Sequence, residues 1–442
     1  MATTIIGLGY VGLTLSLKLA SMGETVHAVE KKPEVVKSLL SGVPHINEPG
    51  LEEHLRKSIG SKFFPSTGYP GKGSCSTHIL CVNTPVDAEG HPDLQPLIKA
   101  ARELSSHISE EDMVLLRSTV PPGTAREIVA KMLEKGSGLK CGENLHLCVA
   151  PERTVEGNAF EELGRLPQIV GGINEDSSKK AYEFFSKITP KVKIVSSMEA
   201  AEITKLMDNS YRYAIFALGN ELGLTCESLG LDSREVIRAA NWEYPRNDIK
   251  LPGAGVGGGC LPKDSSILMD AMIKAGLKPR IMAAAKEIND RMPERIFDKV
   301  VKFHKKHHID PGDSKILILG FAFKGRPEVN DTRHSPGGHL CRMLDRRGYD
   351  VFGFDPIVNP EQIASYGAHV CQTAEEGFSN ATCVIAMNDN SRWNQLDLEK
   401  LSSMLTNSSI VIDGWDVLER GKISKENVYF WRLGDGREAE GR

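Results

Sequence analysis

The sequence TTIIGLGYVGLTLSLKLASMG, residues 3–23, begins with a short apolar run, passes through three glycines and continues with helical periodicity. Gly7, Gly9 and Gly12 have the G-x-G-x-x-G spacing of a strand-to-helix turn that binds the pyrophosphate of a dinucleotide. In such a turn the glycines permit a tight bend, close backbone approach to the phosphates and close helix packing. The helix N-terminus adds N–H groups and the positive end of its dipole. The stretch therefore predicts a Rossmann-like domain.

An acidic residue follows this turn at the distance that the motif requires. The next strand, TVHAVE, ends in Glu30, about twenty residues on, where a carboxylate hydrogen-bonds the adenosine ribose 2′-hydroxyl and repels a 2′-phosphate. We therefore expect NAD rather than NADP, although Lys31 and Lys32 could face a phosphate. A glycine-rich turn in another kind of α/β protein is the alternative.

Three later segments, residues 78–85, 113–123 and 145–152, are predicted strands that end in small or polar residues. Ligands of open parallel sheets bind at the carboxyl ends of the strands. The polar residues there are candidates for lining the nicotinamide side, with ordinary strand-end capping as the alternative. These candidates are Asn83, Thr84, Ser118 and Thr119.

The chain then changes character twice. From Glu199 it shows long helical periodicity without strands, and from Pro311 a strand, a glycine turn, a helix and a strand ending in Asp355 repeat the plan of the first domain. We therefore expect an α/β protein with a Rossmann domain over 1–195, a helical domain over 196–310 and a Rossmann-like domain over 311–442. The basic, turn-rich segment 302–313 suits a linker.

The composition limits the possible classes of protein. Of 442 residues 40% are hydrophobic and 25% charged, and the formal net charge of −4 comes without basic runs that would predict nucleic-acid binding. No apolar run is long enough for a membrane span, and the N-terminus lacks the pattern of a signal peptide. The nine cysteines include no C-x-x-C pair, and the histidines at 304, 307 and 308 have no evident cysteine partner. We expect a cytoplasmic enzyme with reduced thiols and no metal.

Two patterns offer candidate chemistry. Glu202, Lys205 and Asn209 are spaced i, i+3, i+7, so they share one face of a helix. That face is expected to line a water-filled cleft; the alternative is an ordinary helix face exposed to solvent. The stretch VGGGCLPKD, residues 256–264, places Cys260 directly after three glycines.

The motifs together resemble one enzyme family. They are GLGYVGL (7–13), NEPGLEEHL (47–55), VNTP (82–85), STVPPG (118–123), PERTVEG (151–157), EITKLMDNSYR (202–212), PGAGVGGGCLPKD (252–264), LGFAFKG (319–325) and NDTRHSP (330–336). This set is similar to the UDP-sugar 6-dehydrogenases, which use NAD to oxidise the C6 hydroxyl of a nucleotide sugar to a carboxylate in two steps. The resemblance implies that 196–310 is a dimerisation and catalytic domain, that 311–442 binds UDP, and that the chain forms a homodimer or a larger assembly.

The resemblance also implies a mechanism. Cys260 adds to the aldehyde to form a thiohemiacetal, whose oxidation gives a thioester that water hydrolyses. Lys205 stabilises negative charge on the C6 oxygen, Asn209 holds that oxygen or a water, and Asp264 assists the base chemistry. Glu156 is the implied base for hydrolysis, Glu152 a substrate-binding or general-base group, and Thr119 a group that positions water.

Binding residues follow from the same resemblance. The implied cofactor contacts are Gly7, Gly9, Tyr10, Val11, Gly12, Glu30, Asn83, Thr84, Ser118, Lys263 and Arg333. The implied substrate contacts are Arg153, Arg246, Gly257, Phe323 and Lys324, and Arg246 would reach the partner subunit's site.

The motifs divide between two branches of the family. PER and YPRNDIKLPGAGVGGG, residues 244–259, resemble the branch that acts on UDP-N-acetylhexosamines of the mannosamine, glucosamine or galactosamine type, whose usual histidine is Gly259 here. CLPKD and Glu156 resemble the UDP-glucose branch. We expect a UDP-N-acetylhexosamine, with UDP-glucose as the alternative. A one-step hydroxyacid dehydrogenase and a non-catalytic nucleotide-sugar sensor are the more distant alternatives.

Overall fold

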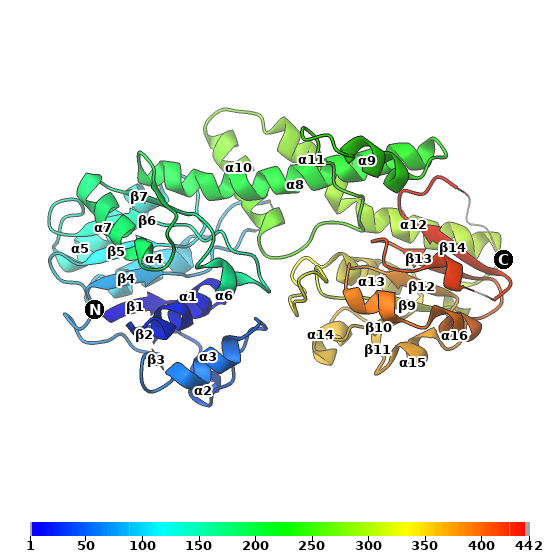
Figure 1. Ribbon diagram of the computed structural model, residues 1–442, viewed down its shortest axis with the longest axis horizontal. Helices are drawn as coiled ribbons and strands as arrows, with labels where there is room; N and C mark the ends of the chain where they lie inside the picture. Colours follow the sequence, from blue (N-terminus) through cyan, green and yellow to red (C-terminus); the bar gives the residue numbers. More distant parts are fainter. Residues whose placement is uncertain (1, 88, 424, 438–442) are drawn as a thin grey trace. The chain divides into compact units, whose positions relative to one another are not determined.

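Two compact units make up the computed structural model, which describes residues 2–87, 89–423 and 425–437 (Figure 1). The first unit comprises Met1–Asn209 with Lys263–Lys278, and the second comprises Ser210–Pro262 with Pro279–Arg442. Each unit is built around one mainly parallel sheet. The α/β fold class expected from the sequence is therefore confirmed.

The sheet of the first unit has the strand order β3-β2-β1-β4-β5-β6-β7-β8. Neighbouring strands are parallel except β6 and β7, which pair antiparallel. Every residue of β4, β5 and β6 is buried, as is typical of a sheet covered on both faces. The strands are β1 (Ala2–Ile6), β2 (Thr25–Val29), β3 (Phe63–Ser66), β4 (Thr77–Leu80), β5 (Met113–Leu116), β6 (His146–Val149), β7 (Gln168–Gly172) and β8 (Val192–Ile194).

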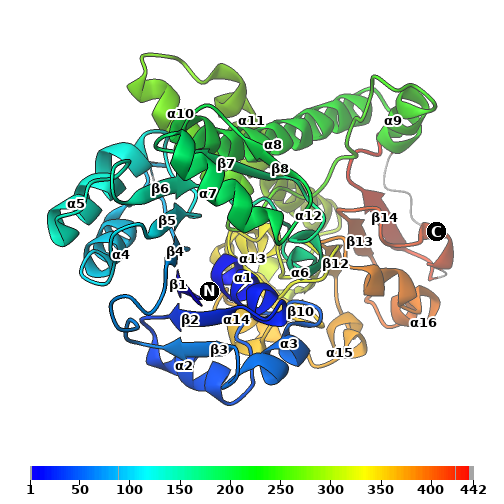
Figure 2. The same ribbon diagram turned by 60° about the vertical axis from the view of Figure 1, so that its left-hand side comes forward.

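Helices cover both faces of this sheet (Figure 2). Met113 and Leu115 of β5 pack in one apolar core with α1, α3 and α7, whereas Val114 and Leu116 pack in the other with α4, η1 and α5. The helices are α1 (Tyr10–Ser21), α2 (Pro33–Leu40), α3 (Leu51–Ser58), α4 (Gln95–Leu104), the π-helix η1 (Ala125–Ala130), α5 (Lys131–Ser137), α6 (Ala159–Glu162) and α7 (Glu175–Ser186).

The strand order of the first unit reverses between β1 and β4. These strands are parallel neighbours, with Ile6 opposite Leu80. Gly7 and the segment 82–85 follow them at the same carboxyl edge. Such a switch point is where open α/β sheets bind ligands, so the glycine turn lies in the position that a dinucleotide site requires.

The sheet of the second unit has six parallel strands in the order β11-β10-β9-β12-β13-β14, which repeats the order of the first six strands in the first unit. Its faces pack against α12 and α13 in one core and α15 and α16 in another. The elements are η2 (Pro311–Asp313), β9 (Lys315–Leu319), α13 (Pro336–Arg346), β10 (Asp350–Phe354), α14 (Pro360–Ala364), β11 (His369–Val370), α15 (Ala374–Phe378), β12 (Cys383–Ala386), η3 (Ser391–Gln395), α16 (Leu398–Ser403), β13 (Ser409–Asp413), η4 (Arg420–Lys422) and β14 (Val428–Arg432). The expected second Rossmann-like plan is confirmed.

Five helices lie along the chain between these two sheets. They are α8 (Met198–Ser228), α9 (Ser233–Asn241), α10 (Leu261–Lys274), α11 (Arg280–Asp290) and α12 (Met292–Lys306). The linker predicted over 302–313 is wrong for its first part, because residues 302–306 form the last turn of α12. Phe303 and His304 are buried there, and burial lowers the pKa of His304 to about 4. Within the described residues, no helix is long and apolar enough to cross a membrane.

Candidate functional site

The glycine turn fits a bound pyrophosphate. Gly7 has φ +92°, and a Cβ added to Gly12 would lie 1.8 Å from the carbonyl oxygen of Gly7, so both positions exclude a side chain. A Cβ added to Gly9 would meet no atom within 4 Å, so Gly9 faces open space at the N-terminus of α1. That first turn carries no acidic residue. The turn is closed toward the protein and open toward a ligand, as the motif predicts.

Glu30 and Tyr10 lie beside this turn. Glu30 Oε2 accepts a hydrogen bond from the backbone N–H of Leu8 at 2.9 Å, and Oε1 accepts one from Lys32 N–H at 3.1 Å. Glu30 remains partly exposed at the end of β2. The Tyr10 hydroxyl donates to the backbone oxygen of Asn47 at 3.0 Å, whereas Val11 packs against the core. The carboxylate is therefore held at the turn where it can meet a ribose hydroxyl.

Replacing Glu30 with glutamine is expected to shift cofactor preference toward NADP. The change removes the charge that repels a 2′-phosphate and weakens a charge-assisted hydrogen bond worth about 1.5–3 kcal/mol, so the ratio of kcat/KM for NAD over NADP should fall roughly tenfold to a hundredfold. Initial rates with each cofactor measure this ratio. Glu34→Gln, at an exposed residue of α2, is the control. An unchanged ratio in Glu30→Gln would remove Glu30 from the cofactor site.

The predicted strand-end residues gather at the same edge of the sheet. Thr84 is buried, and its hydroxyl donates to the backbone oxygen of Thr119. The Ser118 hydroxyl donates to the backbone oxygen of Val82 at 2.7 Å. Asn83 is exposed. These contacts tie the segments after β4 and β5 together and leave the Asn83 side chain accessible to a ligand.

The polar stripe of α8 is buried. Lys205 is only 8% exposed, and within the described part of the chain no residue forms a hydrogen bond or ion pair with its ammonium group. Asn209, one turn further along, donates from Nδ2 to Asp264 Oδ2 at 2.6 Å, and Lys263 Nζ pairs with Asp264 Oδ1 at 2.7 Å. The alternative of a solvated face is therefore wrong. The Lys205 side chain is thus largely withdrawn from water without an anionic partner among the described residues, which is costly and points to a ligand at this position.

Glu202 of the same stripe points to a different neighbour. Its side chain is 2% exposed, Oε2 accepts from Gly123 N–H at 2.6 Å and Oε1 accepts from Ala125 N–H at 2.8 Å. It therefore holds the turn after Ser118 and Thr119 against α8. Burial raises the pKa of Glu202 to about 7, against the opposing effect of the two N–H groups and with a smaller contribution from Glu199.

The raised pKa of Glu202 predicts a pH-dependent stability. Because the folded protein holds this proton up to about pH 7 and the unfolded chain loses it near pH 4.5, Glu202 contributes stability below pH 4.5 that is lost as the pH rises to about 7. Relative to Glu202→Gln, the free energy of unfolding of the wild type should fall by about 1.4 kcal/mol per pH unit over this range. Chemical denaturation between pH 5 and 7 measures the difference, and parallel slopes would contradict the assignment.

Glu152 belongs to a buried ion pair. Its Oε2 pairs with Arg117 Nη2 at 2.5 Å, and its Oε1 accepts from the N–H groups of Arg153 and Thr154 at 2.7 and 2.8 Å. Burial would raise the pKa of Glu152, but the Arg117 guanidinium and these N–H groups together hold it below its usual range. Such a carboxylate positions the chain around residues 150–154 better than it accepts a proton.

Arg153 and Glu156 continue this loop. Arg153 Nε pairs with Asp208 of α8 at 2.8 Å, and its Nη1 donates to the backbone oxygen of Pro167 at 3.1 Å. Glu156 is partly buried, and the next residue, Gly157, donates its N–H to Glu48 Oε2 at 2.7 Å. The loop is therefore anchored at both ends by charged partners.

Cys260 is exposed in the second unit, directly before α10. Among the described residues it is the one exposed cysteine, since seven others are buried and Cys141 is partly buried. Burial raises the pKa of the Cys81 and Cys141 thiols to about 12, which suppresses their thiolate forms at neutral pH. Exposure thus singles out the cysteine that the sequence motif indicated.

The glycines before Cys260 are required by neighbouring protein segments. A Cβ on Gly257 would lie 2.5 Å from the backbone oxygen of His334, and one on Gly258 would lie 2.8 Å from the Phe323 ring. Gly258 has φ +89° and donates its N–H to the backbone oxygen of Arg333 at 2.9 Å. In the structure, the absence of side chains at Gly257, Gly258 and Gly259 thus admits the segments that carry Phe323 and Arg333.

Gly259 is covered by Arg333. A Cβ on Gly259 would lie 2.5 Å from the guanidinium carbon of Arg333. That guanidinium also pairs with Asp331, with Nη2 at 2.6 Å from Oδ2. A histidine at position 259 would displace Arg333, so the departure from the N-acetylhexosamine pattern has a local structural counterpart.

The remaining predicted substrate residues lie in two places of the second unit. Lys324 Nζ is 5.5 Å from the centre of the Phe323 ring, so these two are together. Arg246 is exposed on a different loop, with its guanidinium 5.6 Å from the Tyr244 ring centre.

Asp355 ends β10 as Glu30 ends β2, but its environment differs. It is 8% exposed, its Oδ2 accepts from the N–H groups of Phe321 and Ala322, and its Oδ1 accepts from those of Ile357 and Val358. The Asp355 carboxylate therefore accepts hydrogen bonds from the surrounding backbone at both of its oxygens.

Sequence reasoning missed three charged residues that organise the first unit. Arg117, Asp208 and Glu48 hold Glu152, Arg153 and Gly157, respectively. The motif NEPG contained Glu48, but nothing in the spacing gave its partner. In the part of the chain that the structure describes, no group of three or more His, Cys, Asp or Glu side chains could hold a metal ion.

Comparison with known proteins gives consistent matches over nearly the whole chain. Three models of the UDP-glucose/GDP-mannose dehydrogenase family match in order: the NAD binding domain at residues 1–189, the central domain at 199–291 and the UDP binding domain at 317–420. The chain is 32% identical to the UDP-N-acetyl-D-mannosamine dehydrogenase of Pyrococcus horikoshii over 422 residues, 95% of this chain and 96% of that protein.

Two further comparisons extend this result. The chain is 29% identical to the UDP-glucose 6-dehydrogenase AglM of Haloferax volcanii, over 95% of this chain and 98% of that protein. The solved structure of the UDP-D-ManNAc dehydrogenase from Pyrococcus horikoshii matches with a TM-score of 0.89 and 30% identity, and the match covers 99% of this chain and 100% of that chain.

Proposed function

Because the chain belongs to the UDP-glucose/GDP-mannose dehydrogenase family, we propose that it oxidises the C6 hydroxyl of a UDP-N-acetylhexosamine of the mannosamine type to a carboxylate. The chain is an NAD-dependent nucleotide-sugar dehydrogenase, as the sequence predicted. Its similarity to the Pyrococcus horikoshii enzyme supports the mannosamine substrate. UDP-glucose is the second candidate, supported by the Haloferax volcanii relative and by the CLPKD motif.

The residues of the first unit fit NAD. The open side of Gly9, the N-terminus of α1 and the Glu30 carboxylate would hold the pyrophosphate and ribose. Asn83, Thr84, Ser118 and Lys263 remain proposed contacts further along the cofactor, and Arg333 is proposed from its motif. When bound, NAD accepts hydride, which is chemistry that the side chains alone do not supply.

The observation that carries the proposed reaction is the Lys205 side chain, which is 8% exposed and whose ammonium group has no hydrogen-bond or ion-pair partner among the described residues. A cation at this position stabilises negative charge that develops on the C6 oxygen as the alcohol loses its proton. Asn209 and Asp264, joined by a 2.6 Å hydrogen bond, supply an amide donor and a carboxylate next to it. Thr119 is proposed to position a water.

Cys260 supplies the second half of the reaction. The Cys260 thiolate would form a bond to the aldehyde carbon, whose oxygen takes up a proton. The resulting thiohemiacetal would give up a hydride to bound NAD and its hydroxyl proton to a base, and so become a thioester. Water then attacks the carbonyl carbon, the C–S bond breaks, the thiolate leaves and a carboxylate takes up the water's proton. Glu156 is our proposed acceptor. Phe323 and Lys324, and the Gly257 backbone, are proposed contacts of the nucleotide sugar.

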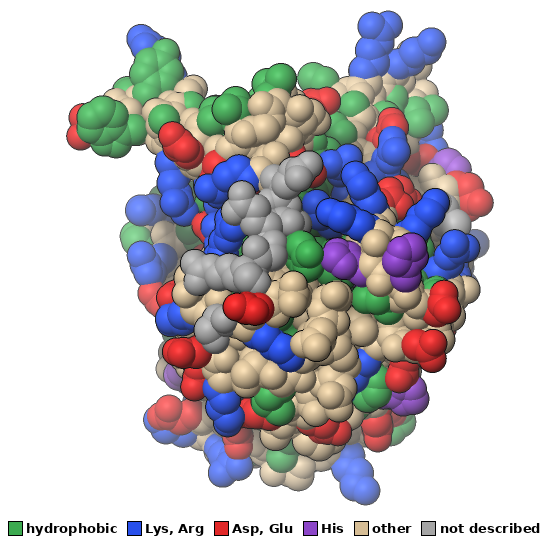
Figure 3. Space-filling view, turned by 90° about the vertical axis from the view of Figure 1, so that its right-hand side faces the viewer, with side chains coloured by type: hydrophobic (Ala, Val, Ile, Leu, Met, Phe, Trp, Pro, Cys, Tyr) green, Lys and Arg blue, Asp and Glu red, His purple; other side chains and the backbone are tan. Residues whose placement is uncertain are grey.

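We further propose the division into domains 1–195, 196–310 and 311–442, and a homodimer formed through the second of these. The three matched model ranges support the division. In the second unit, large hydrophobic side chains are exposed within residues 211–244 and at Ile281, and Trp242 is 76% exposed. Figure 3 shows hydrophobic side chains along the upper edge of one face. Exposed apolar surface of this kind marks protein interfaces, and the exposed Arg246 lies beside Tyr244, one of these side chains. A cytoplasmic location is proposed from the cysteines, none of which forms a disulfide.

A substrate panel tests the proposed function. UDP-N-acetylmannosamine, UDP-N-acetylglucosamine, UDP-N-acetylgalactosamine and UDP-glucose are compared by kcat/KM, and NADH is counted against sugar consumed. We expect two NADH per sugar and the highest kcat/KM with UDP-N-acetylmannosamine. A ratio of one with an aldehyde or ketone product would indicate a one-step dehydrogenase, and no turnover with any of these sugars would favour a sensor. The highest kcat/KM with UDP-glucose would select the second candidate.

A further inference from the structure

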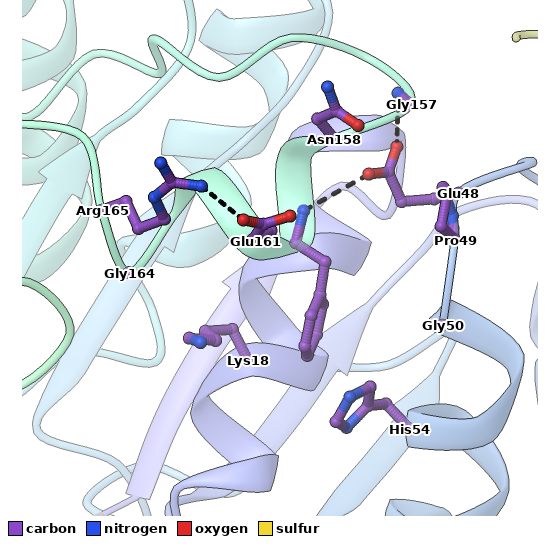
Figure 4. Close-up of a pocket in the computed structure, with 11 residues that line it drawn as sticks. Lys18, Glu48, Pro49, Gly50, His54, Gly157, Asn158, Glu161, Gly164 and Arg165 are labelled. Carbon is purple, nitrogen blue, oxygen red and sulfur yellow. Dashed lines mark hydrogen bonds and ion pairs between the residues drawn. The ribbon is translucent and has the colours of Figure 1, made fainter. Parts of the chain in front are cut away.

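A buried glutamate connects the glycine turn to the loop that carries Glu156. Glu48 is 6% exposed, and Figure 4 shows it directed at the chain around Gly157. Its Oε2 accepts the Gly157 N–H at 2.7 Å, and its Oε1 accepts the Phe160 N–H at 3.3 Å. Glu48 and Gly157 both line a cavity of about 550 Å³, together with Lys18, His54 and Asn158.

The segment that carries Glu48 is itself held from the other side. The Tyr10 hydroxyl, at the first residue of α1, donates to the backbone oxygen of Asn47 at 3.0 Å. Asn47 directly precedes Glu48. One short loop therefore joins the N-terminus of α1 to the segment 156–160.

The Gly157 N–H belongs to the same planar peptide group as the carbonyl of Glu156. A hydrogen bond from this N–H to a fixed carboxylate therefore restricts the orientation of the Glu156 backbone. Gly157 has φ +92°, so the chain turns sharply just after Glu156. Hydrogen bonds to a charged acceptor are about twice as strong as neutral ones, which suits Glu48 to this task.

We propose that Glu48 is a positioning residue that sets the orientation of Glu156 for hydrolysis of the Cys260 thioester. The inference rests on the proposed function, in which Glu156 takes a proton from the attacking water as the C–S bond breaks and the Cys260 thiolate leaves. Loss of the Glu48 contacts would slow this step and leave both oxidations, which precede it, near their normal rates.

The test compares Glu48→Gln and Glu48→Ala with the wild type and with Glu161→Gln. Glu161 lines the same cavity, but it is exposed and pairs with Arg165 on the surface. Stopped-flow absorbance of NADH and the intact mass of quenched enzyme are recorded with the best sugar of the panel. Misplacing a reacting group by about 1 Å can cost about a hundredfold, so steady-state kcat should fall about 10- to 100-fold in both Glu48 variants.

Which reaction step becomes slow in the Glu48 variants identifies the role of Glu48. We expect a burst of two NADH per active site followed by slow turnover, and a covalent adduct with the mass of the acyl sugar that is absent when Cys260 is also replaced by serine. Glu161→Gln should behave as the wild type. A wild-type kcat in Glu48→Gln, or a reduced kcat without burst and adduct, would overturn the proposal. If Glu48→Ala does not fold, the isosteric Glu48→Gln decides alone. A wild type that releases only one NADH per sugar would instead contradict the proposed function.

Discussion

Replacing Cys260 with serine is expected to reduce formation of the uronic acid on the order of 10³-fold or more, while NAD binding is retained. Removal of a covalent nucleophile commonly has effects of this size or larger. The serine hydroxyl is a far weaker nucleophile than a thiolate at neutral pH, so the aldehyde cannot be held as a readily oxidised adduct. The change removes no atom of the glycine turn or of Glu30, which belong to the first unit, so we expect cofactor binding to persist. Acid production is followed by chromatography, and cofactor affinity by titration.

Cys141→Ser provides the matched control for Cys260→Ser. Cys141 is partly buried, and burial raises the pKa of its thiol to about 12, so it should not act as a nucleophile. This variant should keep the wild-type rate. If Cys260→Ser makes acid at the wild-type rate, the thioester route is excluded.

Replacing Arg117 with methionine is expected to lower the free energy of unfolding by about 3–5 kcal/mol, because it leaves the buried Glu152 carboxylate without its counter-charge. The Arg117 side chain is fully buried and also donates to the backbone oxygen of Ala150 and to Gln168, each at 3.0 Å. Urea denaturation measures the loss. The double variant Arg117→Met with Glu152→Gln should recover part of it, since the neutral amide carries a smaller desolvation cost.

Arg56→Met is the control for this stability measurement. Arg56 pairs with Glu52 one turn away on α3, where both side chains are more than half exposed. Exposed pairs of this kind contribute about 0.3–0.5 kcal/mol. Equal losses in Arg117→Met and Arg56→Met would show that the buried pair contributes no more than a surface pair.

Local patterns were enough to predict the two sheets. The glycine turn, the acid at Glu30 and the repeat of this plan ending in Asp355 are set by backbone geometry within about thirty residues, and the two sheets share one strand order around β1 and β9. The antiparallel direction of β7 was not predictable, because the apolar run at Gln168–Gly172 fits a strand of either direction. Residues 302–306 were predicted as a linker because their basic side chains outnumber the apolar Phe303, so the helical periodicity was not recognised.

The sequence predicted which residues belong to the candidate site, but not which partners they contact. The stripe of Glu202, Lys205 and Asn209 follows from helical spacing, yet spacing does not reveal that Glu202 binds backbone N–H groups at Gly123 and Ala125 instead of Lys205. Likewise, the partners of Glu152 and Gly157 lie 35 and 109 residues away in the sequence. Such pairs are set by tertiary packing, which the local spacing of residues in one sequence does not reveal.

The buried state of Asp355 has a consequence for the order of events. Four backbone N–H groups already use its oxygens, so the carboxylate that corresponds to Glu30 is not available to an adenosine ribose in the second unit, and we expect each chain to bind a single NAD. A four-electron oxidation then requires the reduced cofactor to leave and a fresh one to enter between the two hydride transfers. The sugar must stay bound during this exchange, and in the proposed mechanism a covalent bond to Cys260 would keep the half-oxidised carbon from escaping while the cofactor is replaced.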